Sequence, residues 1–292
     1  MKLVTQTDCM AKTYGAEGAV VRLARAGYDA LDWSFFELAG PGSIWLQSDW
    51  RERAEAIRDL AAQEGVSIVQ AHAPFPSSRG LEAYDGMIME RIRRSVEVAS
   101  IMGVQHIVVH PKHHLPYLSH RGELWQMNVD FFTSLIPLCE EFGIHICAEN
   151  MWQRDEYRQV IRESICAAPE EFAALLDAVD SPWITGCLDI GHCALVGIDP
   201  CHAIRILGPD RIAALHVHDV DYVQDRHMLP FTESLDWISI MGELAGIGFE
   251  GNLTFEADQF LAKLPSQLRE DGAAFMVKVG RFLIGLFEEH EA

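Results

Sequence analysis

Short apolar runs rich in β-branched residues recur along the whole chain, and a stretch with helical periodicity separates each run from the next. Runs of this length predict buried strands, whereas apolar residues spaced three and four apart predict helices. Eight such runs are present, at residues 2–7, 30–35, 67–73, 106–110, 145–149, 184–190, 213–218 and 252–257. The pattern therefore predicts eight strands that alternate with helices without a break.

Helix start and stop signals support this alternation. Helical periodicity marks residues 17–28, 49–65, 90–103, 128–143, 169–180, a segment beginning after Asp199, residues 234–248 and a final helix from about Arg269. Asp49 is placed as an N-cap. The predicted helices end at Gly27, Gly65, Gly103, Gly143 and Gly248, which matches the preference for glycine just beyond a helix C-terminus.

Near-continuous hydrophobic strands joined by crossover helices predict a parallel sheet that is buried on both faces. Eight such units can close into a (β/α)₈ TIM barrel of the α/β class, and 292 residues suit a single domain spanning residues 1–292. An open doubly wound sheet is the alternative. It is disfavoured because no GxGxxG turn follows the first predicted strand, and for the same reason we expect no nucleotide cofactor.

Two connections are longer than a barrel requires, namely residues 74–88 and 111–127. Both follow the carboxyl ends of predicted strands, and loops on that face of a barrel carry function. We therefore expect them to form a rim or lid over a site. The 111–127 connection is also a candidate subunit contact in a homo-oligomer.

Charge limits the classes of partner. The chain has 23 Lys and Arg residues against 43 Asp and Glu residues, for a net charge of −20, so nucleic acid and anionic membranes are disfavoured partners. The first residues alternate polar and apolar positions, unlike a signal peptide, and no apolar run is long enough to span a bilayer. We expect a soluble, cytoplasmic protein.

The seven cysteines are scattered and form no CxxC pair, so a disulfide framework or a structural zinc knuckle is not expected. Most lie in apolar surroundings and are interpreted as small core residues. Cys9 and Cys193 stand apart because each lies beside a segment predicted to form the active site. The cysteines are Cys9, Cys139, Cys147, Cys166, Cys187, Cys193 and Cys201.

Residues of the types that commonly bind metals gather at the carboxyl ends of six successive predicted strands. They are His72, His110, Glu149, Asp189 with His192, His216 with His218, and Glu256. A histidine at one strand end is usually a hydrogen-bonded structural residue, but six strands with the same feature are unusual. Because a parallel barrel places all these ends on one face, the side chains are expected to point at one cavity.

The carboxylates among these residues point to a divalent cation. Glu149, Asp189 and Glu256 directly follow apolar runs, and buried carboxylates need a cation or a hydrogen-bonded partner. A buried salt-bridge network would need Lys or Arg at the strand ends, and these segments contain none. Oxygen-rich coordination with one imidazole suits Mn²⁺, Mg²⁺ or Co²⁺, whereas several histidines shift the preference to Zn²⁺.

The simplest ligand set takes one residue from each of the last four strands: Glu149, Asp189, His218 and Glu256. His216 and His218 are two apart on a strand and share a face. We assign the ligand to His218, which is nearer the mouth, and a structural or supporting role to His216. Asp225 and His227 form a DxH pair in the following loop, which could hold an ion or a substrate or could be exposed to solvent.

The motifs resemble the sugar phosphate isomerase/epimerase superfamily, the xylose-isomerase-like barrels that include abasic-site endonucleases. The resemblance covers nearly the whole chain. It lies in HAPF at 72–75, VVHP at 108–111, AEN at 148–150, LDIGH at 188–192, HVHD at 216–219, DRHMLP at 225–230 and FEAD at 255–258. No single motif is diagnostic, but their order at successive strand ends makes the superfamily assignment strong.

The ketose epimerase and isomerase branch implies one divalent ion held by Glu149, Asp189, His218 and Glu256, with His192 contacting substrate oxygens. Glu149 and Glu256 would also serve as catalytic acid and base, moving a proton next to a carbonyl that the metal polarises and forming an enediolate. The expected function is a metal-dependent isomerase or epimerase acting on a small carbohydrate. A keto-polyol dehydratase, which begins with the same proton abstraction, is an alternative.

The endonuclease branch implies three zinc ions, and its ligands have counterparts in His72, His110, Glu149, Asp189, His192, His218, Asp225, His227 and Glu256. A multi-zinc phosphodiesterase therefore stays open, although the charge of −20 and the lack of basic loops oppose DNA binding. A non-catalytic sugar-binding barrel is a third hypothesis.

Substrate specificity is not fixed by the motifs, because LPFTESLDW follows His227 where the family commonly has a Pro-Gly-x-Gly turn. Trp33, near the end of the second predicted strand, is a candidate substrate-facing aromatic or a core residue. Three arginines are candidate contacts for a substrate phosphate or loop and surface residues: Arg154, Arg158 and Arg226. Trp237 is expected to pack in the interior.

Overall fold

The computed structural model describes residues 1–291 and confirms the barrel. Its eight parallel strands are β1 (Leu3–Gln6), β2 (Ala30–Ser34), β3 (Ser67–His72), β4 (His106–Val109), β5 (His145–Glu149), β8 (Ile184–Asp189), β9 (Ile212–His216) and β10 (Leu253–Phe255). They pair in the order β10-β1-β2-β3-β4-β5-β8-β9. A parallel bridge between Val217 and Phe255 joins the chain after β9 to β10 and brings the two ends of the sheet together.

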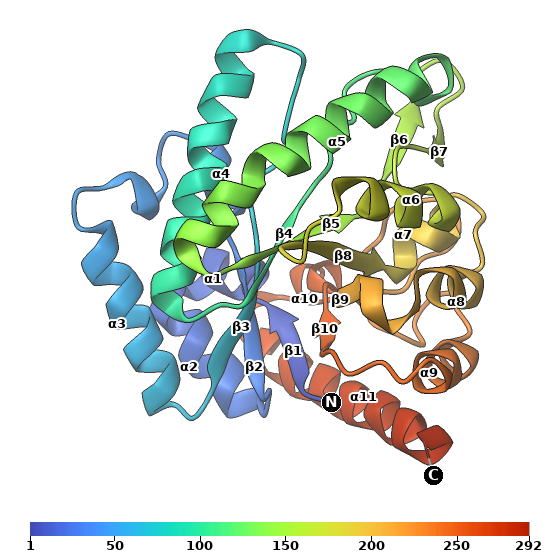
Figure 1. Ribbon diagram of the computed structural model, residues 1–292. Coiled ribbons are helices and arrows are strands. Elements are labelled where there is room, and N and C mark those ends of the chain that lie inside the picture. The colour runs from blue at the N-terminus through green and yellow to red at the C-terminus, as the bar shows by residue number, and fades with distance from the viewer. Residues whose placement is uncertain (292) are drawn as a thin grey trace.

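Helices surround the strands, as Figure 1 shows. They are α1 (Asp8–Tyr14), α2 (Ala16–Ala26), α3 (Trp50–Gln63), α4 (Glu82–Met102), α5 (Tyr117–Phe142), α6 (Pro169–Val179), α7 (Ile190–Leu195), α8 (Pro200–Arg211), α9 (Trp237–Gly246), α10 (Asp258–Ala262) and α11 (Arg269–Glu291). Three 3₁₀ turns are η1 (Phe36–Ala39), η2 (Ile44–Leu46) and η3 (Ser266–Leu268). The glycines after α2, α4 and α5 have left-handed backbone angles, which explains why glycine ends these helices.

The main hydrophobic core lies between the sheet and the helices, where Leu23, Ile92 and Phe132 are fully buried. A separate small cluster forms inside the barrel from Val108, Cys147, Cys187 and Ala214. Six of the seven cysteines are buried and Cys201 is half-buried, and all seven are free thiols. The interpretation of most cysteines as core residues is therefore confirmed.

The two long connections are shorter than the sequence predicted. Helix α4 begins at Glu82 and helix α5 at Tyr117, so both helices start inside the stretches 74–88 and 111–127. In α5 the backbone at His120 departs from helical angles (φ −129°), and Gly122 lies in the next turn. The polar residues 119–121 and Gly122 interrupt the apolar periodicity, so the sequence did not indicate the first turns of this helix.

The sequence did not predict the antiparallel hairpin formed by β6 (Trp152–Asp155) and β7 (Val160–Glu163). It follows β5 and therefore projects from the carboxyl face of the barrel. Its strands are short and partly exposed, so they lack the continuous apolar run that marks a buried strand. Among residues 1–291, no helix combines the length and the apolar character needed to cross a membrane.

Candidate functional site

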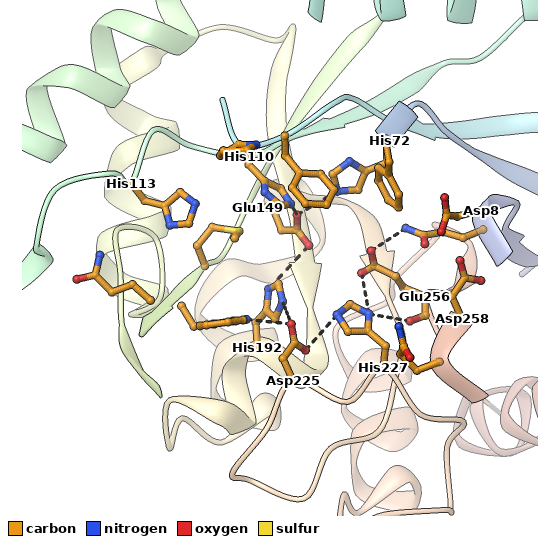
Figure 2. A pocket seen from close by; sticks show the side chains of 18 of the residues that line it. Asp8, His72, His110, His113, Glu149, His192, Asp225, His227, Glu256 and Asp258 are labelled. Atoms are coloured by element: carbon orange, nitrogen blue, oxygen red, sulfur yellow. Dashed lines mark hydrogen bonds and ion pairs between the residues drawn. The ribbon is translucent and has the colours of Figure 1, made fainter. Parts of the chain in front are cut away.

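A cavity of ≈ 580 Å³ opens at the carboxyl ends of the strands. Seven side chains chosen from the sequence line it: His72, His110, Glu149, His192, Asp225, His227 and Glu256. Figure 2 shows Glu149 and Glu256 pointing into this cavity from different parts of the barrel. The barrel thus gathers residues from strands far apart in the sequence, as expected for the functional face of this fold.

Three buried carboxylates and one imidazole form the centre of the site. Glu149 ends β5, Asp189 ends β8, His216 ends β9, and Glu256 directly follows β10. One atom capable of binding a metal from each of the four lies within 4.8 Å of the others. His216 Nδ1 is 2.7 Å from Glu149 Oε1 and 3.0 Å from Glu256 Oε2. These four residues are a candidate metal centre.

The geometry favours His216 over His218 as the histidine of this centre. His218 lies one layer further out, where its Nε2 is 3.0 and 3.1 Å from the two carboxylate oxygens of Asp189. A Cβ atom on Gly191 would lie only 2.1 Å from His218 Cε1, so glycine at this position makes room for the ring. Both histidines share a face, but only His216 reaches the level of Glu149 and Glu256.

His72 and His110 lie on the other side of Glu149. His110 Nε2 is 2.8 Å and His72 Nε2 is 3.5 Å from Glu149 Oε2. The Nδ1 of His72 donates a hydrogen bond of 2.8 Å to the carbonyl of Ala73, which directs Nε2 toward Glu149. His72, His110 and Glu149 therefore form a second group with the spacing of metal ligands.

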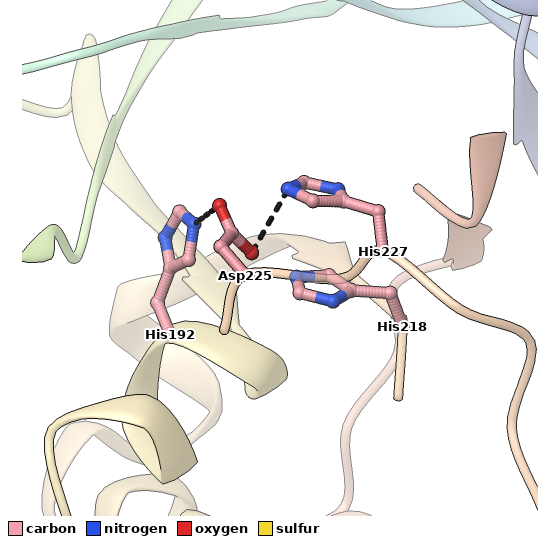
Figure 3. A group of neighbouring side chains, drawn as sticks. All are labelled: His192, His218, Asp225 and His227. Carbon is pink, nitrogen blue, oxygen red and sulfur yellow. Dashed lines mark ion pairs between the residues drawn. The ribbon is translucent and has the colours of Figure 1, made fainter. Parts of the chain in front are cut away.

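A third group contains His192, His218, Asp225 and His227. Figure 3 shows the Asp225 carboxylate between the rings of His192 and His227, at 3.7 Å and 3.1 Å. The rings of His218 and His227 are stacked with centroids 4.1 Å apart. The DxH pair of the loop therefore lies in the cavity rather than in free solvent.

Backbone contacts fix the orientation of this third group. His192 Nδ1 donates to the carbonyl of Asn150 at 2.9 Å, so its Nε2 is directed toward Asp225. His227 Nδ1 donates to the carbonyl of Glu256 at 3.0 Å. The indole N–H of Trp152, in the hairpin, donates to Asp225 Oδ2 at 3.2 Å. The loop and the hairpin therefore hold the group together.

The electrostatics of the centre fit a bound cation. No lysine or arginine within residues 1–291 forms an ion pair with Glu149, Asp189 or Glu256. Burial alone would raise the pKa of Glu149, but the imidazoles of His216 and His110 hold that pKa well below its usual value. Burial would likewise lower the pKa of His227, yet Asp225 and Glu256 raise it to about 10. Protonated histidines are the local counter-charge, and a divalent ion would supply the same charge.

The cavity wall contains residues that the sequence did not single out: Gln6, Asp8, Lys12, Phe36, Phe75, Pro76, His113, Met151, Trp152, Gln153, Asp258 and Gln259. Arg154, a candidate phosphate contact from the sequence, also lines the cavity. Phe75 stacks on His110, and Phe36 packs edge-on against His72. Asp258 is half-buried beside Asp8, and loss of solvent around its carboxyl group is the main cause that raises its pKa to about 8. Phe75 and Asp258 belong to the quoted motifs HAPF and FEAD, which could have indicated them.

Trp33 and Arg226 lie outside the cavity lining. Trp33 is 3% exposed and packs edge-on against Trp45 in the main core. Because side chains alternate along a strand, Asp32 faces the barrel interior and Trp33 faces the helices. Arg226 forms ion pairs with Asp221 and Glu233. The geometry therefore favours packing for Trp33 and a loop ion pair for Arg226.

Comparison with known proteins places these features in a family. The model of the family described as xylose isomerase-like TIM barrel matches residues 20–278. An uncharacterized protein of Methanocaldococcus jannaschii is 26% identical over 243 residues, which cover 80% of this chain and 76% of that protein.

Two solved structures share the fold at low sequence identity. A D-tagatose 3-epimerase-like protein is 22% identical with a TM-score of 0.76, and the match covers 100% of both chains. The D-psicose 3-epimerase of Clostridium cellulolyticum H10 is 15% identical with a TM-score of 0.74, over 97% of this chain and 99% of that chain. At these identities the likeness concerns the fold.

Proposed function

The chain belongs to the xylose isomerase-like TIM barrel family, and we propose that it is a metal-dependent isomerase or epimerase of a small sugar or sugar derivative. One observation carries the proposal: two buried glutamates, Glu149 and Glu256, contact the same imidazole nitrogen at the bottom of a cavity. Relatives in fold are named as ketose 3-epimerases, which supports a ketose or a related keto sugar as the substrate.

The residues that would hold a divalent ion are Glu149, Asp189, His216 and Glu256. Three carboxylates and one imidazole suit Mn²⁺, Mg²⁺ or Co²⁺, and the histidines nearby also leave Zn²⁺ as a candidate. When bound, the ion would act as a Lewis acid that polarises a substrate carbonyl and makes the neighbouring C–H group more acidic.

Glu149 and Glu256 would move the proton. Gln6 Nε2 donates to Glu256 Oε1 at 2.7 Å, and His110 contacts Glu149 Oε2 at 2.8 Å, so both carboxylates are held in fixed orientations. Strands β8 and β9 separate β5 from β10, so the two groups approach a substrate from different sides. One group accepts the proton next to the carbonyl as a carboxylate, and the other returns a proton as a carboxylic acid.

Other cavity residues would bind the substrate. His192 Nε2 faces the cavity, because Nδ1 is held by the Asn150 carbonyl, and can contact a hydroxyl oxygen. Phe36, Phe75 and Pro76 form an apolar wall against which the C–H face of a sugar can pack. A cavity of ≈ 580 Å³ falls in the range of about 300–1,000 Å³ that is usual for small-molecule sites.

Hydrogen exchange tests the proposal directly. Metal-loaded protein is incubated in D₂O with a panel of ketoses, aldoses and keto-polyols, and deuterium at the carbon next to the carbonyl is measured by NMR. We expect exchange with the wild type and a loss of more than a hundredfold in Glu149→Gln and Glu256→Gln, since a positioned acid or base contributes about 10²–10⁴-fold. The exposed Glu55→Gln variant is the matched control.

No exchange with any member of the panel would contradict the proposal. Where exchange is observed, product analysis separates an isomerase or epimerase from a keto-polyol dehydratase, because only dehydration releases water and lowers the number of hydroxyl groups in the product. A barrel that only binds sugars would bind the ligand without exchange.

A multi-metal hydrolase is a second candidate, favoured by the two further groups around His72 and Asp225 that have the spacing of metal ligands. Metal analysis of the purified protein distinguishes the candidates, since one ion per chain favours the isomerase and three favour the hydrolase. Incision of an abasic-site duplex by the zinc-loaded protein would support hydrolysis. The charge of −20 opposes binding of a polyanion such as DNA.

A further inference from the structure

Asp32 is a carboxylate inside the barrel with few partners. It lies on β2 and is 0% exposed. Gln70 Nε2 donates to its Oδ2 at 2.9 Å, and Thr254 Oγ1 donates in turn to Gln70 Oε1 at 3.3 Å. The other oxygen, Oδ1, has no hydrogen-bond partner in the part of the chain that the structure describes. A buried carboxylate held this way costs stability, so the barrel alone does not explain it.

Among residues 1–291, His216 is the imidazole that lies within 4 Å of the Asp32 carboxylate. The distance from His216 Nε2 to Asp32 Oδ2 is 3.8 Å, and both side chains are fully buried. Over residues 1–291, Nε2 has no hydrogen-bond partner, whereas Nδ1 faces Glu149 and Glu256. The ring of His216 therefore lies between the carboxylates of the cavity and the carboxylate of the barrel interior.

This arrangement has the form of a carboxylate behind a metal-binding histidine. Such histidines commonly give their second ring N–H to a carboxylate, which fixes the tautomer and makes the ring a better ligand. We propose that Asp32 is a positioning residue that orients His216 for metal binding, and that Gln70 and Thr254 hold Asp32 in place. The inference rests on the proposed metal centre and adds an inner polar layer to it.

A neutral isostere tests this role by separating metal affinity from stability. For Asp32→Asn, the affinity of the metal-free protein for Mn²⁺ or Zn²⁺ should fall about 10–100-fold in calorimetric titrations, as for other partners of metal-binding histidines. In urea, the metal-free variant should be at least as stable as the wild type, because the change removes a poorly paired buried charge. Gln70→Leu should weaken ion binding in the same direction.

Asp219 provides the matched control. It is also a fully buried aspartate, but its oxygens accept hydrogen bonds from the backbone of Val220, Glu233, Ser234 and Leu235 and from the indole of Trp237. Asp219→Asn should therefore destabilise the metal-free protein and leave the intrinsic affinity for the ion much less changed. Asp32→Asn should thus lower ion affinity without loss of stability, whereas Asp219→Asn should lower stability with little loss of ion affinity.

Ion binding by Asp32→Asn equal to that of the wild type would overturn the inference and leave the metal centre intact. A wild type that binds neither Mn²⁺ nor Zn²⁺ would overturn the metal centre and the inference together. If Asp32→Asn does not fold, then Asp32 has a structural role and the inference is again overturned, unless Asp32→Ser folds and shows the expected loss of affinity.

Discussion

At the scale of single residues, burial and neighbouring charges shift the pKa values of different histidines in opposite directions. In the cavity, burial would lower the pKa of His216 and His192, but neighbouring acidic groups raise both well above the usual value. His106 lies at the amino end of β4 and stacks on His145, with ring centroids 5.4 Å apart. Burial, with a smaller contribution from the charge of His145, lowers the pKa of His106 from 6.5 to about 4.

His106 predicts a pH dependence of stability that is independent of the cavity. Its folded pKa is depressed, so between pH 6.5 and about pH 4 the unfolded chain binds more protons and stability falls as the pH falls. At about 1.4 kcal/mol per pKa unit, discounted for the partial exposure of the ring, the wild type should lose about 1 kcal/mol more than His106→Gln between about pH 7.5 and pH 5. Urea unfolding of the two metal-free proteins measures this difference.

Since the cavity is identical in the two proteins, its own titration cancels in the comparison. Equal losses in wild type and His106→Gln would show that His106 is solvated in the folded protein. A larger loss of stability in His106→Gln than in the wild type would mean that the folded protein raises the pKa of His106, contrary to the prediction.

The choice between His216 and His218 shows what the sequence could not decide at this scale. Both residues belong to one predicted strand and are two positions apart, so periodicity predicts that both side chains point inward. Which of them reaches the carboxylates depends on where β9 ends and on how Glu149 and Glu256 are placed, and strand ends are uncertain by two residues or more. For Glu149, Asp189 and Glu256 the sequence offered no competing residue, because each is the single acidic residue at the end of its predicted strand.

At the scale of elements, the hairpin of β6 and β7 joins parts of the cavity that the barrel alone does not connect. Trp152 donates to Asp225 in the loop after β9. Gln153 bonds the carbonyl of Leu115 at 3.1 Å and accepts from the amide of Tyr117 at 2.8 Å. The hairpin therefore links the connection after β4 to the loop that carries Asp225 and His227.

Trp152→Phe tests this link by removing one donor while keeping an aromatic ring. A hydrogen bond to a charged group is worth about 1.5–3 kcal/mol, so kcat/KM should fall roughly ten- to a hundredfold with the substrate found by exchange. Tyr157→Phe, at a 96% exposed position of the same hairpin, should have no effect. If the two variants behave alike, the contact between Trp152 and Asp225 does not organise the cavity.

The eight strands and the main helices were predictable because apolar periodicity is strong where an element is buried against the core. The hairpin, the short helix α7 and the first turns of α4 and α5 were not. The hairpin and the first turns have exposed or irregular residues that carry little periodicity, whereas α7 is six residues long and buried throughout, so it shows no amphipathic pattern. A contact across the cavity, from Trp152 to Asp225, helps to fix the hairpin. The same limit explains why Phe75, which lies in the loop after β3, was not placed in the cavity wall.

At the scale of the whole molecule, folding itself assembles the candidate metal centre. Its four residues come from the ends of β5, β8, β9 and β10, and they meet only when the barrel is formed. The unfolded chain has no such site, so ion binding and folding are thermodynamically linked. The molecule also carries a net charge of −20, and the three clustered carboxylates add a local repulsion that a cation would relieve.

Removal of the ion should therefore destabilise the protein. At an ion concentration about a hundred times Kd, a ligand that binds only the folded state contributes about 2.7 kcal/mol, and EDTA should abolish this contribution. Urea unfolding with EDTA, and after refilling with Mn²⁺ or Zn²⁺, measures the difference. In Glu256→Gln, removal of the ion should change the free energy of unfolding much less, because one ligand is weakened. In Glu55→Gln, the change should equal that of the wild type. Identical unfolding curves with and without the ion would mean that the four residues are held together by protonated histidines alone, and the metal centre would then have to be abandoned.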